Sequence, residues 1–148
     1  LGTTANKQGR VAGENAAGGD AVFHGVAGTA VAKVFGLEVA RTGLTERQAR
    51  EEGFEPLSTT VKAASQAHYY PGGGPLHVRL VFQKDGRLLG AQMVGREGAA
   101  HRINAPAVAL HAGMLVEEFA QCDLAYAPPF GPVWDPMLTA ANQLLKAM

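Results

Sequence analysis

An alternation of apolar and polar residues in the middle of the chain constrains its fold more than any other feature. Between residues 76 and 83, apolar side chains occupy every second position, as in a strand with one buried face. The dipeptide Asp85-Gly86 follows, and residues 88–94 are again mostly apolar. Because Asp-Gly favours the tight turn that joins two antiparallel strands, the sequence predicts a half-buried β-hairpin here.

Shorter patterns predict the strands and helices on either side of this hairpin. β-Branched and apolar runs, interrupted by Gly36, predict strands at residues 29–35, 37–42 and 56–64. Thr3 or Thr4 is expected to cap a helix over residues 5–16. A capping box of Thr45 and Gln48 predicts a second, short helix. Apolar spacing predicts further helices over residues 98–113 and 115–122, and one that begins after Asp135 and Pro136.

The predicted elements give an α+β fold. An antiparallel sheet of about four to five strands is expected to carry helices on one face, and one separate helix precedes it. The 148 residues suffice for one domain of this kind. The chain opens with Leu1-Gly2-Thr3 and runs directly into a helical pattern, which suggests a piece of a longer protein.

Charge and cysteine content argue against several classes of function. Thirteen basic residues balance thirteen acidic ones and form no basic run, so nucleic-acid or membrane-surface binding has no electrostatic support. No apolar segment reaches the roughly 18 residues of a membrane span. The single cysteine, Cys122, excludes an internal disulfide and predicts a reducing, cytoplasmic setting.

Common catalytic motifs are scarce. The five histidines show no metal-ligand spacing, so no metal site is predicted. The glycines at 72–74 precede a strand rather than a helix, which is the wrong context for a phosphate-binding loop. Cys122 has acidic neighbours, which do not favour a reactive thiolate, so it is interpreted as a small structural residue. By composition and spacing alone, the chain is not a complete enzyme.

Residues 124–136 form an unusual segment. Four prolines and a glycine exclude a regular helix or a central strand, yet the segment holds Tyr126, Phe130 and Trp134, the only tryptophan. Two interpretations are open: the aromatic side chains fill the core of the domain, or they form a surface for another chain or a ligand. The remaining sequence favours the surface.

Six segments of the chain occur in one order that points to a known family: residues 4–15, 28–29 with 33–35, 40–45, 69–72, 90–98 and 126–130. Together they resemble the C-terminal third of the pyridine nucleotide-disulfide oxidoreductases. The resemblance is to the branch that contains coenzyme A disulfide reductase, NADH oxidase and NAD(P)H-dependent sulfur or polysulfide reductase, and it covers nearly the whole chain. It implies the terminal helix of an FAD-binding domain at residues 1–22 and a homodimer-forming dimerisation domain at residues 23–148.

The resemblance also implies roles for particular residues. In such enzymes the N-terminal end of the first helix lies under the flavin, and tyrosines of the dimerisation domain reach the redox cysteine and thiol substrate of the partner subunit. Tyr126, with Tyr69 or Tyr70, matches these tyrosines and is expected to hydrogen-bond a leaving thiolate or supply its proton. A role in interface packing alone is the alternative. The expected cofactor-binding residues are Leu1, Gly2, Thr3, Pro129 and Phe130.

Some positions depart from the family pattern. Gln66 stands where relatives often have histidine, and Leu115 replaces a hydroxyl helix cap, at a cost of about 1 kcal/mol. Trp134 stands where coenzyme A disulfide reductases carry a lysine; it is therefore expected to contact the substrate and to distinguish it from that of the relatives.

The resemblance as a whole predicts the dimerisation domain of an FAD- and NAD(P)H-dependent disulfide oxidoreductase. Its substrate is expected to be coenzyme A disulfide, polysulfide or a related thiol compound. Hydride would pass from NAD(P)H to FAD, and electrons then to a cysteine that this chain lacks, so the fragment alone is expected to bind no cofactor and to be inactive. The alternatives are an NADH oxidase of the same branch, or a stand-alone dimerising module without catalysis.

Overall fold

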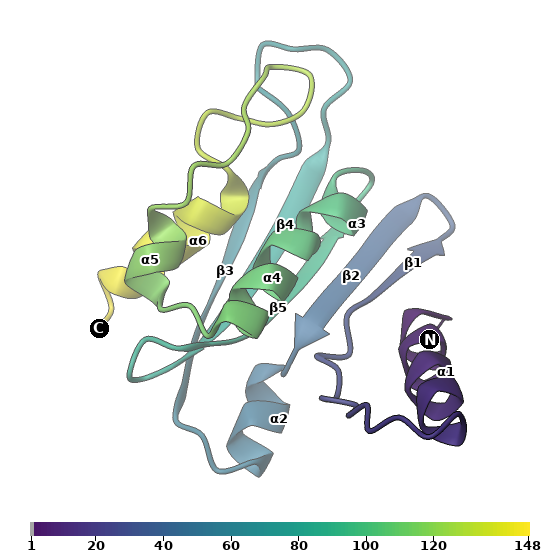
Figure 1. The fold of residues 1–148 in the computed structure, drawn as a ribbon. Coiled ribbons are helices and arrows are strands. Elements are labelled where there is room, and N and C mark those ends of the chain that lie inside the picture. Colours follow the sequence, from purple (N-terminus) through teal and green to yellow (C-terminus); the bar gives the residue numbers. More distant parts are fainter. Residues whose placement is uncertain (1) are drawn as a thin grey trace.

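The computed structural model describes residues 2–148 and contains one five-stranded sheet (Figure 1). All neighbouring strands are antiparallel, in the order β1-β2-β5-β4-β3. The predicted hairpin is confirmed as β4 and β5, with Gly86 in its turn at a φ of 91°. The strands are β1 (Ala30–Val34), β2 (Leu37–Gly43), β3 (Pro56–Ala64), β4 (Pro75–Gln83) and β5 (Leu88–Gly95).

Four of the helices, α3 to α6, lie together on one face of the sheet, as the α+β prediction requires (Figure 1). The main core lies between them and the sheet: Leu80 and Phe82 of β4 pack there with Phe119 of α5 and Leu144 of α6. The helices are α1 (Gly2–Ala16), α2 (Glu46–Glu51), α3 (Ala99–Arg102), α4 (Asn104–Ala112), α5 (Val116–Ala120) and α6 (Pro136–Leu145).

A smaller core lies on the opposite face of the sheet, under α2. Val81 lies between Leu80 and Phe82 on β4, so its side chain points away from the main core. It packs with Leu89 and with Ala49 of α2. The two faces of β4 are therefore covered by different helices.

Local capping signals predicted the starts of α2 and α6 correctly. Thr45 and Gln48 form the predicted capping box of α2. Asp135 caps α6 by accepting a hydrogen bond from the Met137 N–H at 2.9 Å, and Pro136 is the first helical residue. The start of α5 has no hydroxyl cap at Leu115, but the Glu118 carboxylate accepts the Leu115 N–H at 2.8 Å.

Two helix predictions were wrong in detail. The helix expected over residues 98–113 is broken at Ile103 into α3 and α4. Pro106 explains the break: it has no N–H to donate to the carbonyl four residues earlier, which is that of Arg102. At the N-terminus, α1 already includes Thr3 and Thr4, so neither residue caps it.

The N-terminal helix differs from all the others in burial. No residue of α1 is buried, and in Figure 1 the helix lies to one side of the sheet, beyond β1. In the part of the chain that the structure describes, no helix has the length and apolar character to cross a membrane.

Candidate functional site

Two long loops meet beyond one end of the sheet, at the top of Figure 1. The first, residues 65–74, joins β3 to β4, and the second, residues 121–135, joins α5 to α6. The Ala67 N–H donates a hydrogen bond to the Pro128 carbonyl at 3.1 Å, which ties the loops together directly. These loops carry all three tyrosines of the chain.

The hydroxyl groups of Tyr69 and Tyr126 lie 3.0 Å apart and form a hydrogen bond. Tyr69 is 64% exposed and Tyr126 44% exposed, so the pair lies open to solvent or to another molecule. Tyr70 is also exposed, but only its backbone N–H makes a hydrogen bond within the site, to the Ala67 carbonyl. The structure therefore brings together Tyr126 and Tyr69, and leaves the Tyr70 side chain outside this pair.

The hydrogen bond between the phenols alters the acidity of one of them. Tyr69 raises the pKa of the Tyr126 hydroxyl above its ordinary value, and desolvation acts in the same direction. A phenol with a raised pKa keeps its proton at neutral pH and is available as a hydrogen-bond donor. The ring of His68 packs edge-on against Tyr69, with centroids 5.3 Å apart.

Arg102 of α3 has a mostly buried side chain that forms hydrogen bonds with both loops. Its Nη2 atom donates to the carbonyl of Ser65 at 3.0 Å, in the first loop, and to that of Phe130 at 2.7 Å, in the second. Its Nε atom donates to the Asp135 carboxylate at 2.9 Å, and its Nη1 atom to the Gly98 carbonyl at 3.2 Å. One guanidinium therefore donates to three backbone carbonyls and to the carboxylate that caps α6.

The ion pair between Arg102 and Asp135 is mostly buried. Their side chains are 12% and 16% exposed, respectively. The other Asp135 oxygen caps α6, so the guanidinium is anchored to the start of a core helix. Gly98 leaves room for it, because a Cβ atom there would lie 2.2 Å from Nη1.

A second polar contact closes the first loop. The Ser65 hydroxyl donates to the Glu97 carboxylate at 2.7 Å and accepts the Gly74 N–H at 3.0 Å. Ser65 is buried, and Gly74 lies at the opposite end of the loop. Sequence reasoning missed Ser65, Glu97 and Arg102; the local signal available was an arginine directly before the apolar run of α4.

The other predicted residues of the second loop are mostly exposed. Phe130 is 77% exposed and Trp134 is 68% exposed, whereas Pro129 is half-buried. Trp134 borders a hollow of about 470 Å³ that α6 also lines, through residues including Gln143 and Lys146. The aromatic side chains thus do not fill the core of this domain, which supports the surface interpretation.

Among the predicted cofactor-binding residues, Gly2 and Thr3 lie apart from the tyrosines (Figure 1). Leu1 lies outside the described residues, while Gly2 and Thr3 form the first turn of α1 and are exposed. A Cβ atom built on Gly2 meets nothing within 4 Å. The first N–H groups of a helix have no partner within it and carry a positive partial charge, so this open turn fits an electron-rich carbonyl group.

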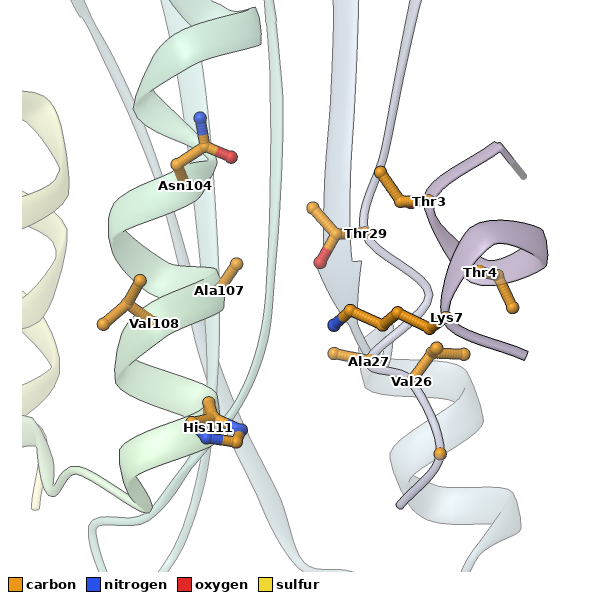
Figure 2. Close-up of a pocket in the computed structure, with 11 residues that line it drawn as sticks. Thr3, Thr4, Lys7, Val26, Ala27, Thr29, Asn104, Ala107, Val108 and His111 are labelled. Carbon is orange, nitrogen blue, oxygen red and sulfur yellow. The ribbon is translucent and has the colours of Figure 1, made fainter. Parts of the chain in front are cut away.

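A separate hollow of about 460 Å³ lies between α1, α4 and the segment before β1 (Figure 2). Thr3 is the only predicted site residue among those that line it. The Lys7 side chain extends from α1 toward Ala27, and His111 lies on α4 across the gap. Within residues 2–148, no group of three or more histidine, cysteine or acidic side chains could bind a metal ion.

Comparisons with known proteins agree with this arrangement. Residues 29–137 match the family described as pyridine nucleotide-disulphide oxidoreductase, dimerisation domain. The chain is 44% identical, over 97% of its length, to an NAD(P)H coenzyme A polysulfide/persulfide reductase of Pyrococcus horikoshii. It is 40% identical, over its whole length, to an NADH oxidase of Methanocaldococcus jannaschii.

A solved structure shows the same fold. An NAD-dependent persulfide reductase from A. fulgidus superposes on 99% of the chain with a TM-score of 0.93 and 42% sequence identity. The chain spans only part of these proteins: 32% of the Pyrococcus protein, 33% of the Methanocaldococcus protein and 28% of the A. fulgidus chain.

Proposed function

Since this chain belongs to the dimerisation-domain family of the pyridine nucleotide-disulphide oxidoreductases, we propose that it forms the dimer interface of an FAD- and NAD(P)H-dependent disulfide oxidoreductase. Its tyrosines would complete the active site of the partner subunit. The observation that carries this proposal is the exposed pair of Tyr69 and Tyr126, whose hydroxyls lie 3.0 Å apart. Exposed aromatic residues around this pair fit a surface that another subunit covers.

The proposed acceptor is a disulfide or polysulfide of the coenzyme A type, because the names of similar proteins point to that class. Reduction of a disulfide by NAD(P)H takes up one hydride, which carries two electrons and a proton, and one further proton, and yields two thiols. When one sulfur leaves as a thiolate, a phenol beside it can donate a hydrogen bond or a proton. The Tyr126 phenol is protonated at neutral pH and can therefore donate, although the hydrogen bond with Tyr69 that raises its pKa also makes it a weaker acid than a free phenol.

The burial of the chain supports the proposed division into two units. The first unit, residues 1–22, would belong to an FAD-binding domain, because α1 has no buried residue among those described. Residues 23–148, which include the whole sheet and its core, would form the dimerisation domain. If FAD binds, it would supply the chemistry that accepts hydride from NAD(P)H and passes two electrons to a disulfide, and the N–H groups of Gly2 and Thr3 would face its electron-rich carbonyl. Pro129 and Phe130 would contact it from the partner subunit.

Replacing Tyr126 with phenylalanine tests the catalytic part of this proposal in the complete flavoprotein. We expect turnover with coenzyme A disulfide or polysulfide to fall about 100-fold, because the loss of a general acid costs on this order or more. Reduction of the flavin by NAD(P)H, measured without acceptor in a stopped-flow instrument, should not change. Tyr70→Phe is the matched control, since its side chain lies outside the phenol pair. Unchanged disulfide turnover in Tyr126→Phe would refute the role.

An NADH oxidase is the second candidate, since a relative with that name matches the whole chain. In that case oxygen, rather than a disulfide, would be the better acceptor. Steady-state rates with oxygen, polysulfide and coenzyme A disulfide, compared at equal NADH, would distinguish the two. Tyr126→Phe should then leave the oxygen rate unchanged.

A further inference from the structure

We infer that Arg102 is a positioning residue, whose guanidinium holds the loop of Tyr69 and the loop of Tyr126 in the register in which their hydroxyls meet. The inference deepens the proposed function and rests on it for its catalytic meaning. Arg102 touches neither tyrosine hydroxyl group in the structure. It would therefore act through the backbone of both loops.

The hydrogen bonds of Arg102 support this inference. A single nitrogen, Nη2, donates to one carbonyl in each loop, Ser65 and Phe130, so the distance between the loops is limited by two bonds of 3.0 and 2.7 Å. Phe130 lies four residues after Tyr126, and Ser65 lies four residues before Tyr69. The bridge thus lies within a few residues of each phenol.

The guanidinium itself has little freedom to move. Asp135 accepts its Nε hydrogen, and the same carboxylate caps α6. The Gly98 carbonyl accepts its Nη1 hydrogen. Gly131 packs closely against the guanidinium, because a Cβ atom added there would lie 3.0 Å from Nη2. A planar guanidinium can satisfy these four acceptors at once, whereas the compact ammonium of lysine cannot span them.

The other links between the loops are weaker constraints. Besides Arg102, the loops share the hydrogen bond from Ala67 to Pro128 and the bond between the phenols. Both phenols are at least 44% exposed, where water competes for their hydrogen bonds. The bond from Ala67 is shielded as well, since Ala67 is 5% exposed, but it is a single neutral hydrogen bond. Arg102 is charged and donates to a carbonyl in each loop, so we expect it to determine whether the phenols remain in contact.

The test is the ionisation of Tyr126 in the folded protein, followed by NMR of a carbon-13-labelled tyrosine ring and assigned with Tyr126→Phe. In Arg102→Lys, the phenols should separate, and the pKa of Tyr126 should fall toward its ordinary value of 10.0. Tyr69→Phe should produce the same fall, because it removes the hydrogen-bond partner directly. Arg79→Lys is the matched control: it alters another arginine on the sheet, away from both loops, and should leave the pKa of Tyr126 raised.

A second measurement records the contact itself. Photo-oxidation couples adjacent tyrosines, and peptide mapping by mass spectrometry would quantify the product that links Tyr69 to Tyr126. Its yield should drop several-fold in Arg102→Lys. If that variant does not fold, Asp135→Asn, which can still cap α6 but loses the charge opposite Arg102, should show the same drop.

The inference would be overturned if the pKa of Tyr126 and the cross-link yield both equalled those of the wild-type protein. The comparison is made in the folded Arg102→Lys variant or, if that variant does not fold, in Asp135→Asn. These measurements report geometry and do not depend on turnover. The catalytic proposal can therefore fail in the Tyr126→Phe assay while the positioning role stands, and the reverse is also possible.

Discussion

Arg102 and Arg79 both join segments that are distant in sequence, but they contact different kinds of group. Arg79, on β4, donates to the side chains of Glu46 on α2 and Ser58 on β3. Arg102 donates mostly to backbone carbonyls in loops. The Arg79 side chain is 42% exposed and the Arg102 side chain only 12%.

This difference has a structural consequence. Without Arg79, Glu46 keeps its contacts with Arg50 and Ser58, and β3 and β4 remain paired along their whole length. Without Arg102, the carbonyls of Ser65 and Phe130 lose a donor, and no regular secondary structure fixes the two loops there. A partly exposed ion pair on a sheet stabilises strands that backbone hydrogen bonds already hold together. A buried arginine among loops supplies hydrogen bonds that determine the conformation of those loops.

The largest expected effect is on stability when each arginine is truncated. Arg102→Ala removes one partner of a buried ion pair and should lower the free energy of unfolding by about 4 kcal/mol. Arg79→Ala should cost about 1 kcal/mol, since exposed ion pairs contribute little. Urea denaturation of both variants measures the difference. Equal losses would mean that burial does not distinguish the two arginines.

Two glycines allow a sharper test of the space around Arg102. Gly98 and Gly72 both have positive φ angles, 81° and 97°, so alanine is strained at either position by about 1 kcal/mol. Only at Gly98 would the new Cβ atom collide with the guanidinium; at Gly72 it meets nothing within 4 Å.

Gly98→Ala should therefore cost about 2 kcal/mol more than the strain alone, because it displaces Arg102 from hydrogen bonds to a charged group. Thermal unfolding, with the ΔG values compared at one temperature, would show this as a larger loss than in Gly72→Ala. If the two substitutions cost the same, the pocket around Arg102 is more adaptable than the structure indicates.

Much of the fold could be predicted because its signals are local. The alternation in β4, the Asp85-Gly86 turn and the caps Thr45 and Asp135 each depend on residues a few positions apart. The break between α3 and α4 was also visible in principle, since Pro106 removes one helical hydrogen bond. It was missed because the apolar spacing continues across the break.

The candidate site depends on contacts that no local pattern encodes. Tyr69 and Tyr126 are separated by 57 residues, and Arg102 is 37 residues from Ser65. The family resemblance pointed to Tyr126 and to a choice between Tyr69 and Tyr70, but nothing in the sequence orients either ring. Arg102 received no prediction, because its role arises only when two loops fold over α3.

The smallest expected effect is a pH dependence at the α2 end of the sheet. The pKa of Glu46 lies below its ordinary value of 4.5, first because the Ser58 hydroxyl donates to the carboxylate, and also because Arg79 and Arg50 stabilise its charge. A carboxylate with a lowered pKa in the folded state stabilises the protein above the pKa of the unfolded state. This stability is lost as the pH falls from about 4.5 through the pKa of the folded state.

Glu46→Gln should therefore lower the free energy of unfolding near neutral pH, and the difference from the wild-type protein should shrink progressively below pH 4.5. Urea unfolding at a series of pH values would measure it. Asp135→Asn provides the comparison at the loop end, where the carboxylate pairs with Arg102. The difference in free energy of unfolding between Glu46→Gln and the wild-type protein could instead stay constant through acid pH. That result would show that Glu46 acts through hydrogen bonds that do not depend on its charge.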